Sequence, residues 1–306
     1  MPRYKAGASR GQALVALSPI LFPLTLYLKP RSRGRVSLAR LAALSNFGVL
    51  AQPCFGRPGV RSMSYSSVAL NQYLVRHTIS GAAADYLRQA HAGLARDIGT
   101  GGYACVVTEY QSRKMGVTVN TESRTHESVY AIHLDFDGRV EAFFEQPPAV
   151  DCRRATKRGH SRLINYVPDM LILSDAGPYV AQVKPERELL SKVAQSKDWI
   201  QEADGTIRDL AAERAFKHLA LPHVVVSTAS LNKLRAANIS LLLQSLEYGA
   251  ADDALKEASA AFLTDHPITR LQDLVEHLGL VDYTPLLNLI ARHQLFTDLS
   301  SFSLTE

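Results

Sequence analysis

The stretch from residue 166 to residue 184, YVPDMLILSDAGPYVAQVK, constrains the fold of this chain most strongly. It predicts a β-hairpin: a β-favouring apolar run, a Ser-Asp-Ala-Gly-Pro turn, and a second apolar run that ends in Gln182, Val183 and Lys184. One charge, Asp169, interrupts the first run. A charge in a buried strand costs free energy unless it is paired or binds a metal ion. Asp169 is therefore the first candidate site residue.

The length of the turn decides which side chains meet across this hairpin. Successive residues of a strand point to opposite faces, so Gln182 and Lys184 share one face. With a four-residue loop at 175–178, Asp169 falls opposite Lys184 on that same face. A loop one residue longer turns Asp169 to the other face unless a bulge corrects the register. We predict the four-residue loop and a site at which Asp169, Gln182 and Lys184 converge.

Charge is distributed very unevenly along the 306 residues. Residues 1–62 contain ten Lys and Arg and no Asp or Glu, residues 63–228 contain nineteen of each sign, and residues 229–306 carry a net charge of −5. The sequence pI near 9.1 therefore comes from the N-terminal segment and not from the folded body. The length suits about two domains, which we expect at 63–228 and 229–306.

The N-terminal segment 1–62 is basic and contains an apolar run, 13–28, that Pro19 and Pro23 interrupt. The run is too short for a membrane-spanning helix, and we expect no membrane association. The segment resembles a transit or signal sequence; the alternative, which we favour, is a translated upstream region with the true start at Met63. The three cysteines lie far apart without Cys-x-x-Cys spacing, which excludes a disulfide scaffold and indicates a reducing cytoplasm.

Between residues 80 and 228, helix-type and strand-type patterns alternate. The expected helices are 80–98, 122–136, 186–194 and 207–219, and the expected strands besides the hairpin are 103–110, 115–119, 139–145 and 221–228. This alternation predicts an α/β domain with a mixed central β-sheet flanked by helices.

A basic connection at residues 151–162 leads into the hairpin. Five cations lie within ten residues: Arg153, Arg154, Lys157, Arg158 and Arg162. One interpretation is a solvated loop, and the other is a contact to the DNA phosphate backbone beside the carboxylates. The sequence leaves both open.

Beyond residue 228 the pattern is almost wholly helical. Helical spacing of apolar residues from 268 to 278 ends at Gly279, and Thr284 and Pro285 precede a second helix at 286–293. With a possible hairpin at 295–302, these elements predict a winged-helix-like unit. The region is acidic and its second helix carries only Arg292 as a cation, which favours docking to a protein partner over DNA reading.

The acid, turn and Gln-x-Lys sequence has the form of the PD-(D/E)xK nuclease core. Here it stands as Pro168-Asp169 and Gln182-Val183-Lys184. Phosphodiester hydrolysis needs an activated water and a stabilised leaving oxygen, and divalent cations supply both, ideally two ions roughly 3.5–4 Å apart. Carboxylate and amide oxygens suit Mg²⁺, for which Mn²⁺ can substitute. A lysine at this place orients the water and offsets negative charge.

The order of four sequence motifs resembles TnsA, the endonuclease subunit of heteromeric transposases. The motifs are a helical Glu127, FFEQPP at 143–148, NYVPDMLIL at 165–173 and AQVKP at 181–185. The resemblance covers about residues 100–228, with a looser likeness in the C-terminal region. It implies a restriction-endonuclease-like core in which Glu127, Asp169 and Lys184 are catalytic. It further implies that Glu127, Asp169 and Gln182 hold the cation, with Gln182 at a place often occupied by an acid.

The resemblance also implies a biological setting. A TnsA-type subunit nicks the 5′ ends of a transposon in double-stranded DNA, while a DDE-type (TnsB-like) transposase subunit cuts and joins the 3′ ends. The C-terminal domain contacts an ATPase regulator (TnsC-like) and the transposase. The expected location is the bacterial cytoplasm, at the nucleoid when active.

Each candidate residue also has a purely structural interpretation. Asp169 can be a turn residue, Lys184 a charge that protects an edge strand from aggregation, and Gln182 a surface residue. Glu127 can serve the helix dipole, and Glu122 competes with it for the catalytic position. Two other functions stay open: a stand-alone restriction-like or repair endonuclease, and a catalytically inactive scaffold that bridges transposition proteins.

Overall fold

The computed structural model describes residues 65–93, 108–121, 126–155, 160–248, 251–267 and 269–304. The N-terminal segment 1–62 lies outside these ranges. In chain order the elements are α1 (Ser67–Arg76), α2 (Gly81–Ala92), β1 (Thr108–Ser112), β2 (Val117–Thr121), α3 (Glu127–Phe136), β3 (Val140–Glu145), β4 (Val150–Ala155), β5 (Ser161–Tyr166), β6 (Met170–Ser174), β7 (Gly177–Lys184), α4 (Glu186–Gln195), β8 (Trp199–Gln201), β9 (Ile207–Asp209), α5 (Leu210–Phe216), β10 (His223–Ser227), α6 (Lys233–Ser245), α7 (Asp253–Asp265), α8 (Leu271–His277) and α9 (Thr284–Ala291). Short 3₁₀ turns follow α5, β10 and α6.

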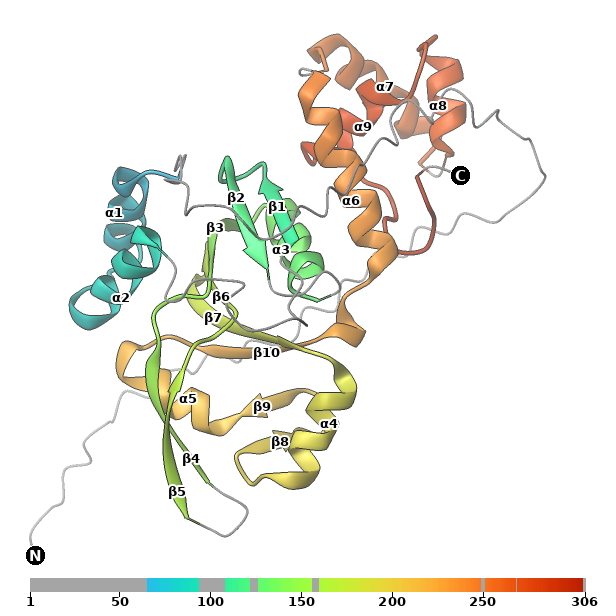
Figure 1. Cartoon of the computed structure of the whole chain (residues 1–306). Helices are drawn as coiled ribbons and strands as arrows, with labels where there is room; N and C mark the ends of the chain where they lie inside the picture. Colours follow the sequence, from blue (N-terminus) through green and yellow to red (C-terminus); the bar gives the residue numbers. More distant parts are fainter. Residues whose placement is uncertain are drawn as a thin grey trace, which may run out of the picture.

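A four-stranded mixed sheet lies at the centre of the α/β part, in the order β10-β7-β6-β3 (Figure 1). The pairs β3–β6 and β6–β7 are antiparallel, whereas β10 lies parallel to β7. Parallel pairing requires a crossover, which here runs through α4 and α5. The prediction of an α/β fold with a mixed sheet flanked by helices is confirmed.

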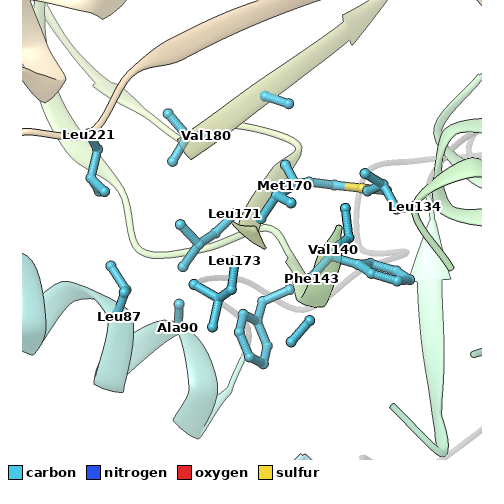
Figure 2. Close-up of a cluster of buried hydrophobic side chains, with 14 of the residues drawn as sticks. Leu87, Ala90, Leu134, Val140, Phe143, Met170, Leu171, Leu173, Val180 and Leu221 are labelled. Atoms are coloured by element: carbon cyan, nitrogen blue, oxygen red, sulfur yellow. The ribbon is translucent and has the colours of Figure 1, made fainter. Parts of the chain in front are cut away.

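The core of this sheet is its two central strands. Every residue of β6 is buried, and alternation sends Leu171 and Leu173 to one face and Met170 to the other. Figure 2 shows Leu173 beside Leu87 of α2, and Met170 beside Leu134 of α3. The helices α2 and α3 therefore cover opposite faces, which explains why β6 is apolar throughout rather than alternating.

The register of the central hairpin differs from the predicted one. Ser174 pairs with Gly177, so the connection has two residues, Asp175 and Ala176, and not four. Gly177 has φ +116°, a conformation that glycine adopts without a Cβ penalty. Pro178 then lies within β7, opposite Leu173. Proline is tolerated there because pairing of β7 with β10 begins only at Val180, so no neighbour needs its missing N–H.

The basic segment is an extended hairpin and not a loop. Strands β4 and β5 pair from Val150↔Tyr166 to Ala155↔Ser161, and the hairpin projects from the body of the molecule (Figure 1). One of its faces is wholly exposed, with the side chains Asp151, Arg153, Ala155, Ser161, Leu163 and Asn165. Solvent on that face permits the charges that hide the strand pattern in the sequence.

The predicted helix 207–219 is split in the structure. Residues Ile207–Asp209 form strand β9, and α5 begins only at Leu210. The Asp209 carboxylate accepts a hydrogen bond from the backbone N–H of Ala212 at 3.1 Å, which satisfies a donor of the first helical turn. This N-cap, three residues inside the predicted helix, ends the strand and starts the helix.

The C-terminal region is helical, as predicted, with α6 to α9, but the hairpin predicted at 295–302 is not formed. Residues 295–302 form turns instead of a hairpin. The buried side chain of Asn238 on α6 donates to Leu299 O at 2.9 Å and Phe302 O at 2.7 Å, and it accepts from Leu304 N at 2.9 Å. These bonds occupy backbone groups that strand pairing needs, so the segment lies along α6.

Helix α3 contributes to two hydrophobic cores. Its residues Tyr130, Ala131 and Leu134 belong to the core of the central sheet. Its last residue, Phe136, packs with Ile239 and neighbouring residues of α6 and α9. The predicted boundary at residue 228 therefore separates two stretches of sequence whose hydrophobic cores share one helix (Figure 1).

A buried carboxylate ties α3 to the turn between β1 and β2. Asp135 accepts hydrogen bonds from Tyr110 Oη at 2.8 Å, Ser112 Oγ at 2.6 Å, Arg113 N at 2.8 Å and Lys114 N at 3.0 Å. Two hydroxyls and two backbone amides thus depend on one side chain that is 5% exposed.

We expect Asp135→Ala to lower the free energy of unfolding by about 2–4 kcal/mol, because it leaves several buried donors without an acceptor. Urea unfolding followed by circular dichroism measures the change. The matched control is Asp85→Ala, which removes an exposed carboxylate that pairs with Arg88 and should cost less than about 1 kcal/mol. Equal losses in the two variants would contradict the assignment.

Candidate functional site

Asp169 lies between β5 and β6, one residue before the strand rather than inside it. Its Oδ2 accepts a hydrogen bond from the backbone N–H of Val183 at 2.7 Å and another from Gln182 Nε2. Its own carbonyl accepts from Gln146 N at 2.9 Å. The register extends so that Asp169 falls opposite Gln182, with Lys184 two residues further on β7. The predicted pairing with Lys184 is wrong, but because the shift is two residues the face is unchanged.

Gln182 is buried, 5% exposed, in the middle of the sheet. Its Oε1 accepts a hydrogen bond from Tyr166 Oη at 2.8 Å, and Tyr166 Oη also lies 2.8 Å from Nε2 of His223. Gln182 is therefore no surface residue, and both ends of its amide have partners. Burial lowers the pKa of His223 to about 4, so this ring is neutral.

Glu127 is the first residue of α3, and its charge acts on Asp169. Burial and then the negative charge of Glu127 raise the pKa of Asp169 from 3.8 to about 7, against opposing effects of Lys184 and the two N–H donors. Two carboxylates that disfavour each other's charge in this way form a site that a cation stabilises. The competing Glu122 lies outside the described residues.

Lys184 ends β7 and is partly exposed. Its Nζ lies 3.8 Å from Glu188 Oε1 on α4, and Glu188 also approaches Lys192 Nζ at 3.4 Å. Lys184 follows Gln182 by two residues and so shares its face. The structure thus brings Glu127, Asp169, Gln182 and Lys184 to one region, from α3, the β5–β6 connection and β7.

The FFEQPP motif helps to fix the backbone of Asp169 through a hydrogen bond from Gln146. Glu145, the last residue of β3, is 4% exposed, and Gln146 is 3% exposed. Gln146 has φ +44°, in the left-handed region that non-glycine residues adopt rarely. This conformation directs its N–H to the carbonyl of Asp169. A strained residue held by its surroundings is a feature common at functional sites.

The basic residues of the hairpin fall into two groups. Arg153 and Arg162 are exposed on β4 and β5. Arg154 instead forms a bidentate ion pair with the buried Asp209, at 2.9 and 2.6 Å, and its guanidinium lies 5.3 Å from the ring centroid of Tyr166. Lys157 and Arg158 lie outside the described residues.

Hard oxygen donors predominate at the site, which suits Mg²⁺ or Mn²⁺. Within the described residues, no group of three or more His, Cys, Asp and Glu side chains could hold a metal ion. The oxygen groups at this place that could hold a cation are the carboxylates of Glu127 and Asp169 and the amide of Gln182. That amide has its nitrogen toward Asp169 in this structure, so its oxygen reaches a cation there only after the amide turns.

Sequence reasoning missed Tyr166, His223 and Gln146. Tyr166 counted only as an apolar strand residue, and His223 only as part of the buried strand LPHVVVST. The signal that could have found His223 is a titratable residue in an apolar run, the same signal that identified Asp169. No sequence signal gives the backbone conformation of Gln146.

No protein-family model matches the chain, and no curated protein matches it significantly. Each helix in the described ranges is too short or too polar to cross a bilayer.

The raised pKa of Asp169 makes a pH-dependent prediction. Between pH 4 and 7 the unfolded chain loses this proton while the folded protein keeps it, so stability falls as pH rises and is constant above pH 7. Each unit of pKa difference corresponds to about 1.4 kcal/mol. Allowing for partial exposure, we expect Asp169→Asn to be more stable than wild type by about 1–3 kcal/mol at pH 8, and equally stable near pH 4.

Urea unfolding at pH 4, 6 and 8 in the presence of a chelator measures this difference. Asp175→Asn, in the exposed connection of the same hairpin, is the matched control and should show no pH-dependent gain. A gain for Asp169→Asn that is the same at all three pH values would refute the raised pKa.

Proposed function

We propose that the chain is a divalent-cation-dependent DNA endonuclease with a restriction-endonuclease-like core, and that it acts as the 5′-end-cleaving subunit of a heteromeric transposase. One observation carries the proposal. A carboxylate with a raised pKa, Asp169, accepts hydrogen bonds from Gln182 and the backbone of Val183, feels the charge of Glu127, and shares its sheet face with Lys184. The order of motifs that resembles TnsA supplies the transposase context.

Glu127, Asp169 and Gln182 are the residues that would hold the cation. When bound, Mg²⁺ or Mn²⁺ lowers the pKa of a water and neutralises phosphate charge. The chain's own contribution is positioning: the backbone N–H of Val183 fixes the Asp169 carboxylate, and β7 fixes Lys184 two residues from Gln182. The ammonium of Lys184 orients the attacking water and offsets negative charge on the phosphate oxygens.

The exposed face of the β4–β5 hairpin is proposed as the contact to the DNA backbone. The hairpin ends at Tyr166, three residues before Asp169, so a duplex on this face passes close to the carboxylates. Arg153 is the exposed cation of this face among the described residues, whereas Arg162 lies on the opposite face, where it pairs with Arg154. Arg154 forms an ion pair with Asp209 and is therefore not proposed as a DNA contact.

The C-terminal helices are proposed to dock on the DDE-type transposase and on the ATPase regulator. Residues 229–306 carry a net charge of −5, which disfavours a duplex at this surface. Large apolar side chains are exposed there, with Val281 fully exposed and Phe296 78% exposed. Apolar groups in an acidic surface favour protein partners over nucleic acid.

The decisive test of catalysis uses donor DNA with transposon ends together with a DDE-type transposase subunit and an ATPase regulator. Asp169→Ala and Lys184→Ala should each abolish 5′-strand cuts, at least a hundredfold, and leave 3′-strand joining intact. Sequencing gels of both strands measure the two reactions. Lys192→Ala, which removes the second partner of Glu188, is the control for Lys184→Ala and should cut normally. Normal 5′ cutting by Asp169→Ala would exclude this site.

A second test concerns the hairpin surface. A plot of log K against log salt concentration has a negative slope, and each phosphate contact that is lost should make this slope less steep by about 1. We expect Arg153→Ala to do so in duplex binding measured by fluorescence anisotropy, and Arg162→Ala, on the opposite face of the hairpin, to change the slope less. Arg270→Ala, an exposed cation paired with Asp273 in the helical region, should leave the slope unchanged. Equal slopes for all variants would place the duplex elsewhere.

A further inference from the structure

A buried hydrogen-bonded chain runs from strand β10 into the candidate site. It joins Nε2 of His223 to Oη of Tyr166, Oη of Tyr166 to Oε1 of Gln182, and Nε2 of Gln182 to Oδ2 of Asp169. The first two bonds are each 2.8 Å long. Gln182 and His223 are 5% and 8% exposed, so water does not replace these bonds.

All the hydrogen bonds of this series donate in the same direction, from His223 toward Asp169. Because the hydroxyl of Tyr166 donates its one proton to Gln182, its oxygen must accept from His223, which therefore carries its proton on Nε2. Nδ1 of His223 is buried and has no hydrogen-bond partner in the described part of the chain. It is then an unpaired acceptor, while the three donors that form the hydrogen-bonded chain, on His223, Tyr166 and Gln182, each have an acceptor.

A cation beside Asp169 reverses this direction. It needs the carbonyl oxygen of Gln182 where the NH₂ group now lies, so the amide must turn and offer its NH₂ group to Tyr166. The hydroxyl of Tyr166 then points to His223, which moves its proton to Nδ1, where no acceptor lies among the described residues. An unpaired buried donor is costly.

We propose that Tyr166 and His223 are positioning residues that hold the Gln182 amide in its cation-free orientation and so weaken cation binding at this site. The inference rests on the proposed function, since it assumes that Glu127, Asp169 and Gln182 hold the cation. It assigns a role to two residues outside the Asp-turn-Gln-x-Lys sequence. The hydrogen bonds that join His223, Tyr166 and Gln182 thus set the concentration of free cation at which the Gln182 amide turns.

Removing the hydroxyl of Tyr166 tests the proposal. In Tyr166→Phe the end of the amide that faces residue 166 lacks a partner in either orientation, and turning the amide no longer moves the proton of His223 to Nδ1. The preference for the cation-free orientation therefore falls. We expect the Kd for Mn²⁺, measured by calorimetry and electron paramagnetic resonance on the full chain, to decrease by about three- to tenfold. Tyr73→Phe removes another buried hydroxyl, which donates to Ser174 O at the far end of β6, and should leave the Kd unchanged.

A double-mutant cycle separates orientation from general packing. A carboxylate has two equivalent oxygens, so Gln182→Glu needs no orientation. Tyr166→Phe should therefore not tighten Mn²⁺ binding in the Gln182→Glu background. Tightening of the same size in both backgrounds, or none in the wild-type background, would overturn the proposal.

Nuclear magnetic resonance of the ¹⁵N-labelled wild-type chain provides a measurement without any variant. The imidazole of His223 should carry its proton on Nε2 in the presence of a chelator and on Nδ1 in saturating Mg²⁺. A proton on Nδ1 in the chelator sample would contradict the inferred direction. Mn²⁺ binding that is equal in wild type and Asp169→Ala would instead refute the cation site of the proposed function itself, and with it this inference.

Discussion

The two-residue connection between β6 and β7 determines the geometry of the whole site. It sets the register in which Asp169 lies opposite Gln182, and it brings the backbone N–H of Val183 to the Asp169 carboxylate. A backbone donor has no rotamers, so the carboxylate is fixed by the sheet itself. The parallel strand β10 then bonds β7 from its other side and carries His223 to the hairpin.

Two features of the site cost folding free energy. Glu127 and Asp169 bring like charges together in a partly buried place, and Gln146 adopts a left-handed conformation to reach the carbonyl of Asp169. The surrounding core compensates, since β6 and residues 180–183 of β7 are buried in the core that also contains side chains of α2 and α3 (Figure 2). Local cost supported by a rigid scaffold is the usual arrangement at functional sites.

The sequence predicted the α/β class because helix-type and strand-type segments alternate along it. It predicted the central hairpin and the shared face of Asp169, Gln182 and Lys184 because these depend on period-2 alternation. It did not predict the loop length, since the choice between Pro178 in a turn and Pro178 in a strand depends on where β10 begins to pair. It missed the β4–β5 hairpin because cations on a solvated face hide the alternation. It predicted a wing at 295–302 because it could not anticipate the side-chain bonds of Asn238.

Helix α3 gives the site a mechanical property. At about 1.5 Å per residue its ten residues form a stiff rod of about 15 Å, with Glu127 at one end and Phe136 among the side chains of α6 and α9 at the other. The same helix also places Tyr130, Ala131 and Leu134 in the core of the central sheet. A helix anchored in both cores resists movement of one core relative to the other, and so keeps Glu127 in place beside the sheet that carries Asp169.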